Sequence, residues 1–357
     1  MNFLIISLMS SLVLATQDSG YPAGFFADCP GMNRTTTLSD ETKDSLSVVL
    51  IWPTRTLFGN SQATCKLSIS GAACVARHLD FKKRKTMIFI SGYLDASFSP
   101  LVRFIVSPYL KRGRNIIIVE TFPVLLRSYP LAARLTKPIG NILGEFLAEL
   151  THRGMSPNKL ELVGGSLGAH IASRAAVKYH YLTHKKPARL TGLDPAGPCF
   201  RNLPPSERFN PTAAQRVDAL HTNMDVFGIA DTVAQVDFYA NGGEYQPAIA
   251  GNFLLPCFVP CSHIRAAFYW LYATSNTDKF IALRCDSVFH ARRGDCYDGH
   301  IETNVLGPKT NFSRPGIYYL PIKAEKPFYF GEEGLVRKSF GLTNYLLNAV
   351  SDENLII

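Results

Sequence analysis

Short runs rich in Ile and Val alternate with helical segments through the middle of this chain, and the alternation limits the folds open to it. The apolar runs cover residues 86–90, 115–119 and 160–163, and a helix is expected near 139–150. Apolar strands separated by helices are typical of a parallel sheet covered on both faces. We therefore expect an α/β fold with a mostly parallel central sheet, whose functional site lies at the carboxyl ends of the strands.

The run 160–163 leads directly into Gly164-Gly165-Ser166-Leu167-Gly168 and then into a helix start. A G-x-S-x-G pattern between a strand and a helix predicts a sharp, strained turn that lifts a serine hydroxyl above the sheet. Gly164 and Gly168 must be nearly free of side chain, because strand and helix crowd together there. The helix also directs its first amides toward the site, where negative charge would develop. Ser166 is the predicted nucleophile.

A serine hydroxyl needs a histidine to remove its proton, and the histidine needs an acid to orient it. In α/β-hydrolases the acid lies between the two in the chain. The next strand is expected over 188–193 and ends at Asp194, one helix–strand unit beyond Ser166. Asp194 is the predicted acid, and a turn or cap role before Pro195 is the alternative. Three other aspartates are weaker candidates because they lie further along the chain: Asp218, Asp231 and Asp237.

The catalytic base should follow Asp194, which leaves two main histidines. His221 ends an expected strand over 216–220 and could be buried support. His263 lies beside Cys261, in a loop that a disulfide would pin just before a helix, and it is the favoured base. Other histidines precede the acid, point away on the serine's own helix, or lie in a charged, Cys-bounded stretch: His152, His170, His180, His184, His290 and His300.

Cysteine usage and the N-terminus indicate an exported protein. Residues 1–15 resemble a cleaved signal peptide, because a short apolar run ends in small residues and is followed by polar ones. Eight cysteines without CxxC pairs then favour disulfides over metal ligands, so we expect no metal and no other cofactor. Close spacing suggests three pairs and leaves the last two cysteines for each other: Cys65–Cys74, Cys257–Cys261, Cys285–Cys296 and Cys29–Cys199.

The formal net charge of +9 raises the question of an anionic partner. Basic clusters such as 82–85 lack interleaved aromatic residues and nucleic-acid motifs, so no nucleic-acid partner is expected. A membrane or micelle surface is the expected partner, and a solvated basic face without a partner is the alternative. Sequons at Asn33 and Asn311 fit an exported glycoprotein.

The chain shows no repeats, low-complexity tract or long linker, so most of it is expected to fold as one unit. The expected organisation is a loose leader or propeptide-like segment over 16–45, a hydrolase domain over 46–345 and a C-terminal tail over 346–357.

Five sequence blocks, in order and at suitable spacing, resemble the pancreatic-lipase family. They are 164–170 (Gly-Gly-Ser-Leu-Gly-Ala-His), 192–198 (Gly-Leu-Asp-Pro-Ala-Gly-Pro), 217–222 (Val-Asp-Ala-Leu-His-Thr), 237–243 (Asp-Phe-Tyr-Ala-Asn-Gly-Gly) and 261–266 (Cys-Ser-His-Ile-Arg-Ala). The resemblance covers about 46–345. It implies the α/β-hydrolase fold and a triad of Ser166, Asp194 and His263, and so it chooses His263 over His221.

The resemblance also implies an oxyanion hole made by the backbone amides of Tyr93 and Leu167. The chain departs from the family at two nearby positions. Ser91 stands where the family usually has the His of His-Gly-aromatic, and Gly165 stands where it usually has His before the serine. Neither position supplies a side chain to the triad, so we expect tuning of activity rather than its loss.

Three further differences from the family's digestive triacylglycerol lipases concern the substrate. Only residues 258–260 separate Cys257 from Cys261, which is too few for the long helical lid of those lipases. The loop 223–235 looks trimmed, and no C-terminal β-sandwich is expected, so no colipase partner is expected either. These features resemble the secreted phospholipase A1 and neutral lipase branch seen in insects.

The resemblance therefore implies a secreted serine carboxylester hydrolase that acts on lipids, either a phospholipase A1 or a neutral glycerolipid lipase. The alternative is a catalytically silent lipid or steroid carrier, like the yolk proteins that also resemble this family. Those carriers lack the triad, whereas this chain has a residue of the required type at each of its three positions.

Overall fold

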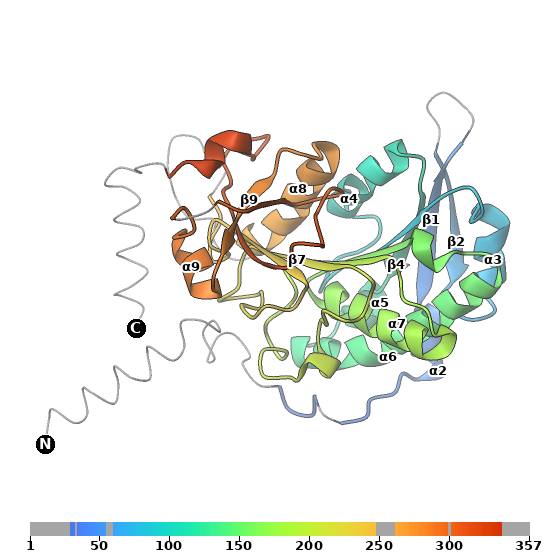
Figure 1. Cartoon of the computed structure of the whole chain (residues 1–357). Coiled ribbons are helices and arrows are strands. Elements are labelled where there is room, and N and C mark those ends of the chain that lie inside the picture. Colours follow the sequence, from blue (N-terminus) through green and yellow to red (C-terminus); the bar gives the residue numbers. More distant parts are fainter. Residues whose placement is uncertain (1–28, 33, 55–59, 248–260, 299–300, 338–357) are drawn as a thin grey trace, which may run out of the picture.

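One mostly parallel sheet organises the molecule (Figure 1). The computed structural model describes residues 29–32, 34–54, 60–247, 261–298 and 301–337. The described strands form an eleven-stranded sheet of order β10-β9-β11-β8-β7-β6-β5-β3-β4-β1-β2. Neighbours from β4 to β11 run parallel, and antiparallel strands extend both edges. The strands are β1 (Ser47–Pro53), β2 (Asn60–Lys66), β3 (Thr86–Ile90), β4 (Asn115–Glu120), β5 (Leu160–Gly165), β6 (Arg189–Leu193), β7 (Val217–His221), β8 (Val236–Ala240), β9 (Ile281–Cys285), β10 (Thr303–Val305) and β11 (Gly316–Leu320).

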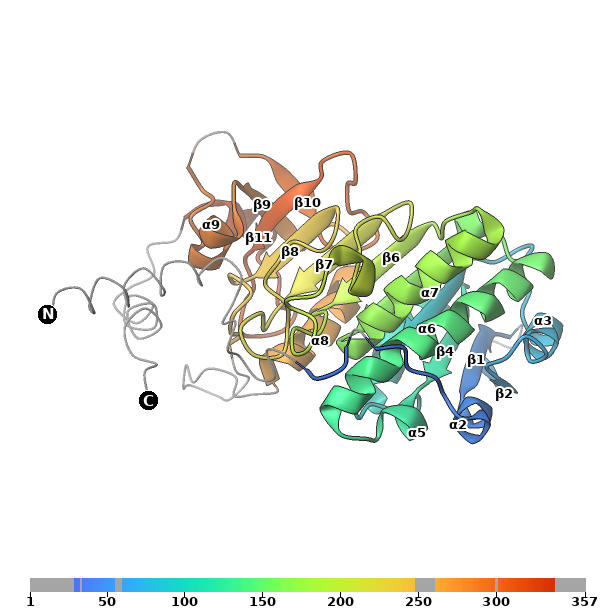
Figure 2. The same cartoon turned by 90° about the horizontal axis from the view of Figure 1, so that it is seen from below.

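Helices cover both faces of the sheet, as the sequence predicts. In Figure 1, α4 and α8 lie above the sheet and α6 and α7 lie below it, and Figure 2 shows α6 and α7 side by side across the lower face. The described helices are α2 (Asp40–Ser45), α3 (Ala72–His78), α4 (Pro100–Lys111), α5 (Phe122–Leu125), α6 (Tyr129–His152), α7 (Leu167–Thr183), α8 (Cys261–Ser275) and α9 (Val288–Arg293). The predicted α/β-hydrolase fold is thus confirmed.

The central strands are rich in apolar residues because they face two cores, as β4 shows. Side chains alternate between the two faces of a strand. In β4, Ile117 and Val119 pack with residues of α6 and α7, whereas Ile116 and Ile118 pack with residues of α4 and α8. All four are fully buried. Residues 116–119 of β4 therefore do not show the apolar–polar alternation of a half-exposed strand.

The direction in which the sheet grows reverses at β3. The chain passes from β3 to β4 on one side, and then crosses back through α6 to β5 on the other side of β3. In open parallel sheets, the crevice at such a reversal is where ligands bind, outside the carboxyl ends of the strands. The segments that follow β3 and β5 contain Tyr93 and Ser166.

Helix α6 is longer than the helix expected over 139–150. It begins at Tyr129 and continues through Pro138 to His152. A proline inside a helix removes the hydrogen bond to the carbonyl four residues earlier, which here belongs to Arg134. The added turns bury Ala132 and Leu135 in the core, so tertiary packing compensates for the lost bond.

Part of the expected leader segment packs against the domain. Leu38 is buried in the same core as α6 and α7, and Arg134 donates a hydrogen bond from Nη2 to Thr36 Oγ1 at 3.2 Å. Cys29 is bonded to Cys199. The domain boundary at residue 46 and removal of a leader stay predictions, and residues 1–28 and 338–357 lie outside the described residues.

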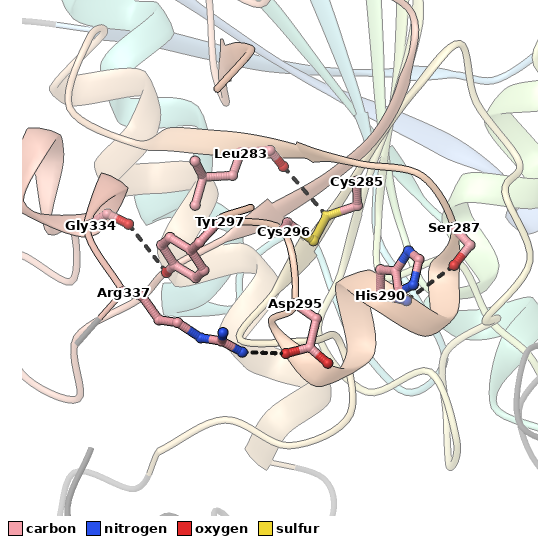
Figure 3. The surroundings of a disulfide bond; sticks show 9 residues. All are labelled: Leu283, Cys285, Ser287, His290, Asp295, Cys296, Tyr297, Gly334 and Arg337. Atoms are coloured by element: carbon pink, nitrogen blue, oxygen red, sulfur yellow. Dashed lines mark hydrogen bonds and ion pairs between the residues drawn. A yellow bond between two sulfur atoms is a disulfide. The ribbon is translucent and has the colours of Figure 1, made fainter. Parts of the chain in front are cut away.

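Three of the four predicted disulfides are confirmed: Cys29–Cys199, Cys65–Cys74 and Cys285–Cys296. The fourth includes Cys257, which lies outside the described residues, as do the expected short lid 258–260 and the sequon residue Asn33. Figure 3 shows the Cys285–Cys296 bond, which joins the end of β9 to the segment after α9, with Asp295 paired to Arg337 beside it. None of the described helices is long and apolar enough to cross a membrane.

Candidate active site

Ser166 lies on the sharp turn between β5 and α7. Its backbone has φ 52° and ψ −122°, a conformation that costs a non-glycine residue about 1–3 kcal/mol. A Cβ on Gly164 would lie 2.4 Å from the Gly168 carbonyl oxygen, and one on Gly168 would lie 2.2 Å from the Ile90 carbonyl oxygen. Both positions must therefore be glycine, as the sequence predicts, because β5, α7 and β3 meet here without room for a methyl group.

The loop after β3 lies directly against the serine. A Cβ on Gly92 would come within 2.8 Å of Ser166 Cβ and 3.4 Å of its Oγ. Tyr93 follows this glycine, so its amide belongs to the same contact region. Leu167 is the first residue of α7, and the first amides of a helix have no partner within the helix. Leu167 thus follows Ser166 directly, Tyr93 follows the glycine that lies against Ser166, and the oxyanion hole stays a prediction.

Asp194 emerges beside Ser166 because their strands are neighbours in register. Gly165, the last residue of β5, pairs with Leu193, the last residue of β6. Ser166 and Asp194 directly follow these two strands. The Asp194 side chain is fully buried. Its Oδ1 accepts hydrogen bonds from the backbone N–H of Thr222 at 2.8 Å and of Asn223 at 3.2 Å. These two donors stabilise a buried carboxylate and fix its direction.

His263 contacts the other oxygen of this carboxylate from the first turn of α8, and not from a loop before that helix as expected from the sequence. Its Nδ1 lies 2.5 Å from Asp194 Oδ2, within hydrogen-bond distance, and since a carboxylate only accepts, Nδ1–H is the donor. With the proton on Nδ1, Nε2 is the basic nitrogen of the neutral ring. The His263 side chain remains 16% exposed, and the Phe227 ring lies 5.6 Å from the imidazole, centre to centre. The acid and base predicted from the sequence therefore meet.

The rival candidates all have structural partners. His221 is fully buried, with Nδ1 2.9 Å from the Ile229 carbonyl oxygen and its ring stacked on Tyr239. It is the buried support that the sequence left open. The three alternative aspartates each form an ion pair or hydrogen bond with another side chain: Asp218 with Arg189, Asp231 with Arg208 and Asp237 with His221.

His170, on the serine's own helix, is also structural. Its Nε2 lies 2.8 Å from the Ala196 carbonyl oxygen, and its Nδ1 accepts the Phe209 N–H at 2.9 Å. Burial lowers the pKa of His170 to about 3, which more than offsets the hydrogen bond to Ala196. The ring is therefore neutral at physiological pH, with its proton on Nε2.

Backbone contacts around Asp194 were missed by sequence reasoning. A Cβ on Gly228 would lie 2.6 Å from Asp194 Oδ1, so the loop after β7 packs directly on the carboxylate. Arg201 holds this loop by donating from Nη2 to the carbonyl oxygens of Val226 at 2.8 Å and Gly228 at 3.0 Å. Main-chain donors can come from any residue type, and so they leave no pattern in a single sequence.

An ion cluster supports the same loop from the C-terminal side. Arg292 of α9 binds Asp225 through both terminal nitrogens, at 2.9 and 3.0 Å, and also contacts Glu244. One guanidinium thus serves two carboxylates. Burial raises the pKa of Glu244 to about 7 although Arg292 opposes the shift. The Cys285–Cys296 bond flanks α9 (Figure 3) and steadies the helix that carries Arg292.

The loop that contains Tyr93 is tied to the segment following β4. The Tyr93 hydroxyl donates to the Arg127 carbonyl oxygen at 2.6 Å. Further along the loop, the Ser97 N–H donates to Glu120 Oε2 at 2.9 Å. Burial raises the pKa of Asp95, which lies between these ties. The backbone near the serine is therefore held on both sides.

Among the described residues, no group of three His, Cys, Asp or Glu side chains could hold a metal ion.

Comparison with known proteins identifies related sequences. A family model described as "Lipase" matches residues 24–328. The rat protein "Lipase member H" is 31% identical over 286 residues, which is 76% of this chain and 59% of that protein. Rat "Pancreatic lipase-related protein 2" is 30% identical over 235 residues, or 60% of this chain and 49% of the relative. The chain thus spans less than two thirds of the length of these relatives.

Among solved structures, the "alpha/beta hydrolase enzyme" MGS-M1 from a deep-sea metagenome matches at 17% identity and a TM-score of 0.31, over 54% of this chain and 72% of that one. The family-model match extends over most of the chain, and the strand order and the Ser166 turn are those of an α/β-hydrolase. The chain belongs to the pancreatic-lipase family and has the α/β-hydrolase fold of that family.

Proposed function

We propose that this protein is a serine carboxylester hydrolase acting on lipids, with Ser166 as nucleophile, His263 as base and Asp194 as the acid that orients it. The observation that carries the proposal is the 2.5 Å contact between His263 Nδ1 and Asp194 Oδ2, beside a serine held at positive φ. A purely structural role for His263 would not account for its partly exposed imidazole, and it would not account for the strained backbone of Ser166.

In the proposed reaction, Ser166 Oγ attacks the ester carbonyl carbon while its proton passes to His263 Nε2. The carbonyl oxygen becomes an oxyanion, which the amides of Tyr93 and Leu167 stabilise; losing one such donor typically costs about 3 kcal/mol in the transition state. The intermediate expels the alcohol, which takes the proton from His263. Water then attacks the acyl-enzyme carbonyl carbon while giving a proton to His263, and His263 returns that proton to Ser166 Oγ as the bond to the acyl group breaks and the fatty acid leaves.

Apolar side chains near the site support a lipid substrate. Leu94 and Phe98 follow Gly92 in the loop after β3 and are 51% and 74% exposed. Leu126, beside the carbonyl that binds Tyr93, is 56% exposed, and Ile264, next to His263, is 39% exposed. Single exposed apolar residues are common, but these four lie on the segments that carry or contact the proposed catalytic groups. These side chains suit the acyl chains of a lipid ester better than the groups of a small, water-soluble ester.

Within lipids, we propose phospholipid or mixed glycerolipid as the substrate class. The net charge of +9 favours anionic lipid surfaces, and the expected short lid would leave the site open to solvent. The relatives are lipases by name. We further propose that the protein is exported, because three disulfides fit an oxidising compartment and residues 1–15 resemble a signal peptide.

Hydrolysis of phosphatidylcholine, galactolipid and triacylglycerol by the purified protein and by its Ser166→Ala variant tests the mechanism. We expect fatty-acid release by the first protein only, with phosphatidylcholine among the hydrolysed lipids. Covalent labelling by a fluorophosphonate should likewise require Ser166. Equal hydrolysis by both proteins would exclude the triad, and lipid binding without labelling would identify a silent carrier instead.

A further inference from the structure

Gln246 lies in the loop after β8, and the proposed mechanism does not use it. Its side chain is buried, with 1% of the residue exposed. Burying an amide is unfavourable unless its hydrogen bonds are made. The partners of Gln246 therefore show what the buried amide holds in place.

The side chain of Gln246 joins two strand ends to helix α8. Its Nε2 donates to the carbonyl oxygens of Thr222 at 3.2 Å, after β7, and Ala240 at 2.7 Å, at the end of β8. Its Oε1 accepts the hydroxyl proton of Tyr269, on α8, at 3.1 Å. The Gln246 backbone N–H donates to Ser262 Oγ at 2.9 Å, in the first turn of the same helix.

These contacts connect the acid and the base. Thr222, whose carbonyl oxygen binds Gln246, gives its own N–H to Asp194 Oδ1. Ser262, which binds the Gln246 amide, directly precedes His263. A single residue thus links the segment that orients the carboxylate to the helix turn that carries the imidazole.

We propose that Gln246 is a positioning residue, which fixes the first turn of α8 relative to the Thr222–Asp194 pair and so keeps His263 Nδ1 in contact with Asp194. This inference rests on the proposed function. Gln246 contacts neither Ser166 nor the expected place of the substrate, and it acts only through the geometry of the acid and the base.

The test compares Gln246→Met with a matched control, Asn304→Leu. Both changes replace a buried amide by an apolar side chain of similar size. Asn304, on β10, is 3% exposed, and it donates from Nδ2 to the Asn311 carbonyl oxygen at 3.0 Å and accepts the Asn311 N–H at 2.8 Å. Its contacts involve none of the proposed catalytic residues. Thermal unfolding of both variants reports the general cost of losing a buried amide.

We expect kcat of Gln246→Met to fall by about 10- to 100-fold, the loss typical of a catalytic group displaced by up to about 1 Å. KM should stay within about twofold, because the substrate contacts are unchanged. Asn304→Leu should change neither kcat nor KM.

Tyr269→Phe is the milder second variant if Gln246→Met does not fold. It removes only the donor to Gln246 Oε1, and we expect a smaller fall in kcat, again with KM nearly unchanged. Unchanged kcat in the folded Gln246 variant, or in Tyr269→Phe when only that protein folds, would overturn the proposal. Failure of the proposed function gives a different result, because Ser166→Ala would then keep its activity.

Discussion

Replacing Gly168 by alanine tests the packing on which the serine turn depends. The new methyl carbon would lie 2.2 Å from the Ile90 carbonyl oxygen and 2.5 Å from that of Ser91. Close carbon–oxygen contacts in proteins are about 3.3–3.6 Å, so α7 and the end of β3 must separate by about 1 Å. Both neighbours are backbone, and no side chain can rotate away. The separation would also move Ser166 from the loop that carries Tyr93.

We expect Gly168→Ala to lose about 1–3 kcal/mol in free energy of unfolding, as overpacking usually does. The kcat should fall by about 100-fold, because a displacement of about 1 Å at the reacting groups has that effect. Urea unfolding measures the first quantity, and ester hydrolysis together with the rate of fluorophosphonate labelling measures the second.

Gly165→Ala is the matched control, since it makes the same chemical change three residues away. Nothing lies within 4 Å of a Cβ built there, and Gly165 is not among the glycines with positive φ. The methyl group should therefore raise the free energy of unfolding by about 0.4–1 kcal/mol, because it lowers the conformational entropy of the unfolded chain. If Gly168→Ala were as stable and as active as Gly165→Ala, the proposed crowding of β3, β5 and α7 around Ser166 would be refuted.

Three further predictions address the acid, the buried charge and the pH dependence. Asp194→Asn should lower kcat by about 10⁴-fold with little change in KM, because the amide favours the wrong imidazole tautomer; hydrolysis retained within tenfold would contradict the assigned role. Arg189→Met leaves Asp218 buried without its cation and should cost about 3–5 kcal/mol in urea unfolding, and a loss below 1 kcal/mol would show that the pair is dispensable. The folded-state pKa of His170, about 3, lies below its unfolded value near 6.5. Its contribution to stability is therefore complete above pH 6.5 and is lost as pH falls toward 3, by about 1.4 kcal/mol per pH unit; His170→Gln should remove this slope between pH 6.5 and 5, and an unchanged slope would refute the assignment.

Local sequence determined the elements around Ser166. Residues 86–90, 115–119 and 160–163 form strands because, apart from Thr86, Asn115 and Glu161, their side chains are apolar on both faces, which suits a doubly covered sheet. Helix α6 shows the limit of this reasoning, because its first turns depend on burial of Ala132 and Leu135 rather than on the pattern around Pro138.

By itself, the sequence determined the fold class and the Ser166 turn, and it correctly suggested the three disulfides that the structure shows, because these follow from residues close together in the chain or from elimination. Only the tertiary structure decided that Asp194 meets His263 while His221 is buried against Asp237, since both histidines follow the acid in the chain. It also revealed Gln246 and the amides of Thr222 and Asn223. Such contacts arise where distant segments meet, and hydrogen bonds to a main chain can be made by almost any sequence.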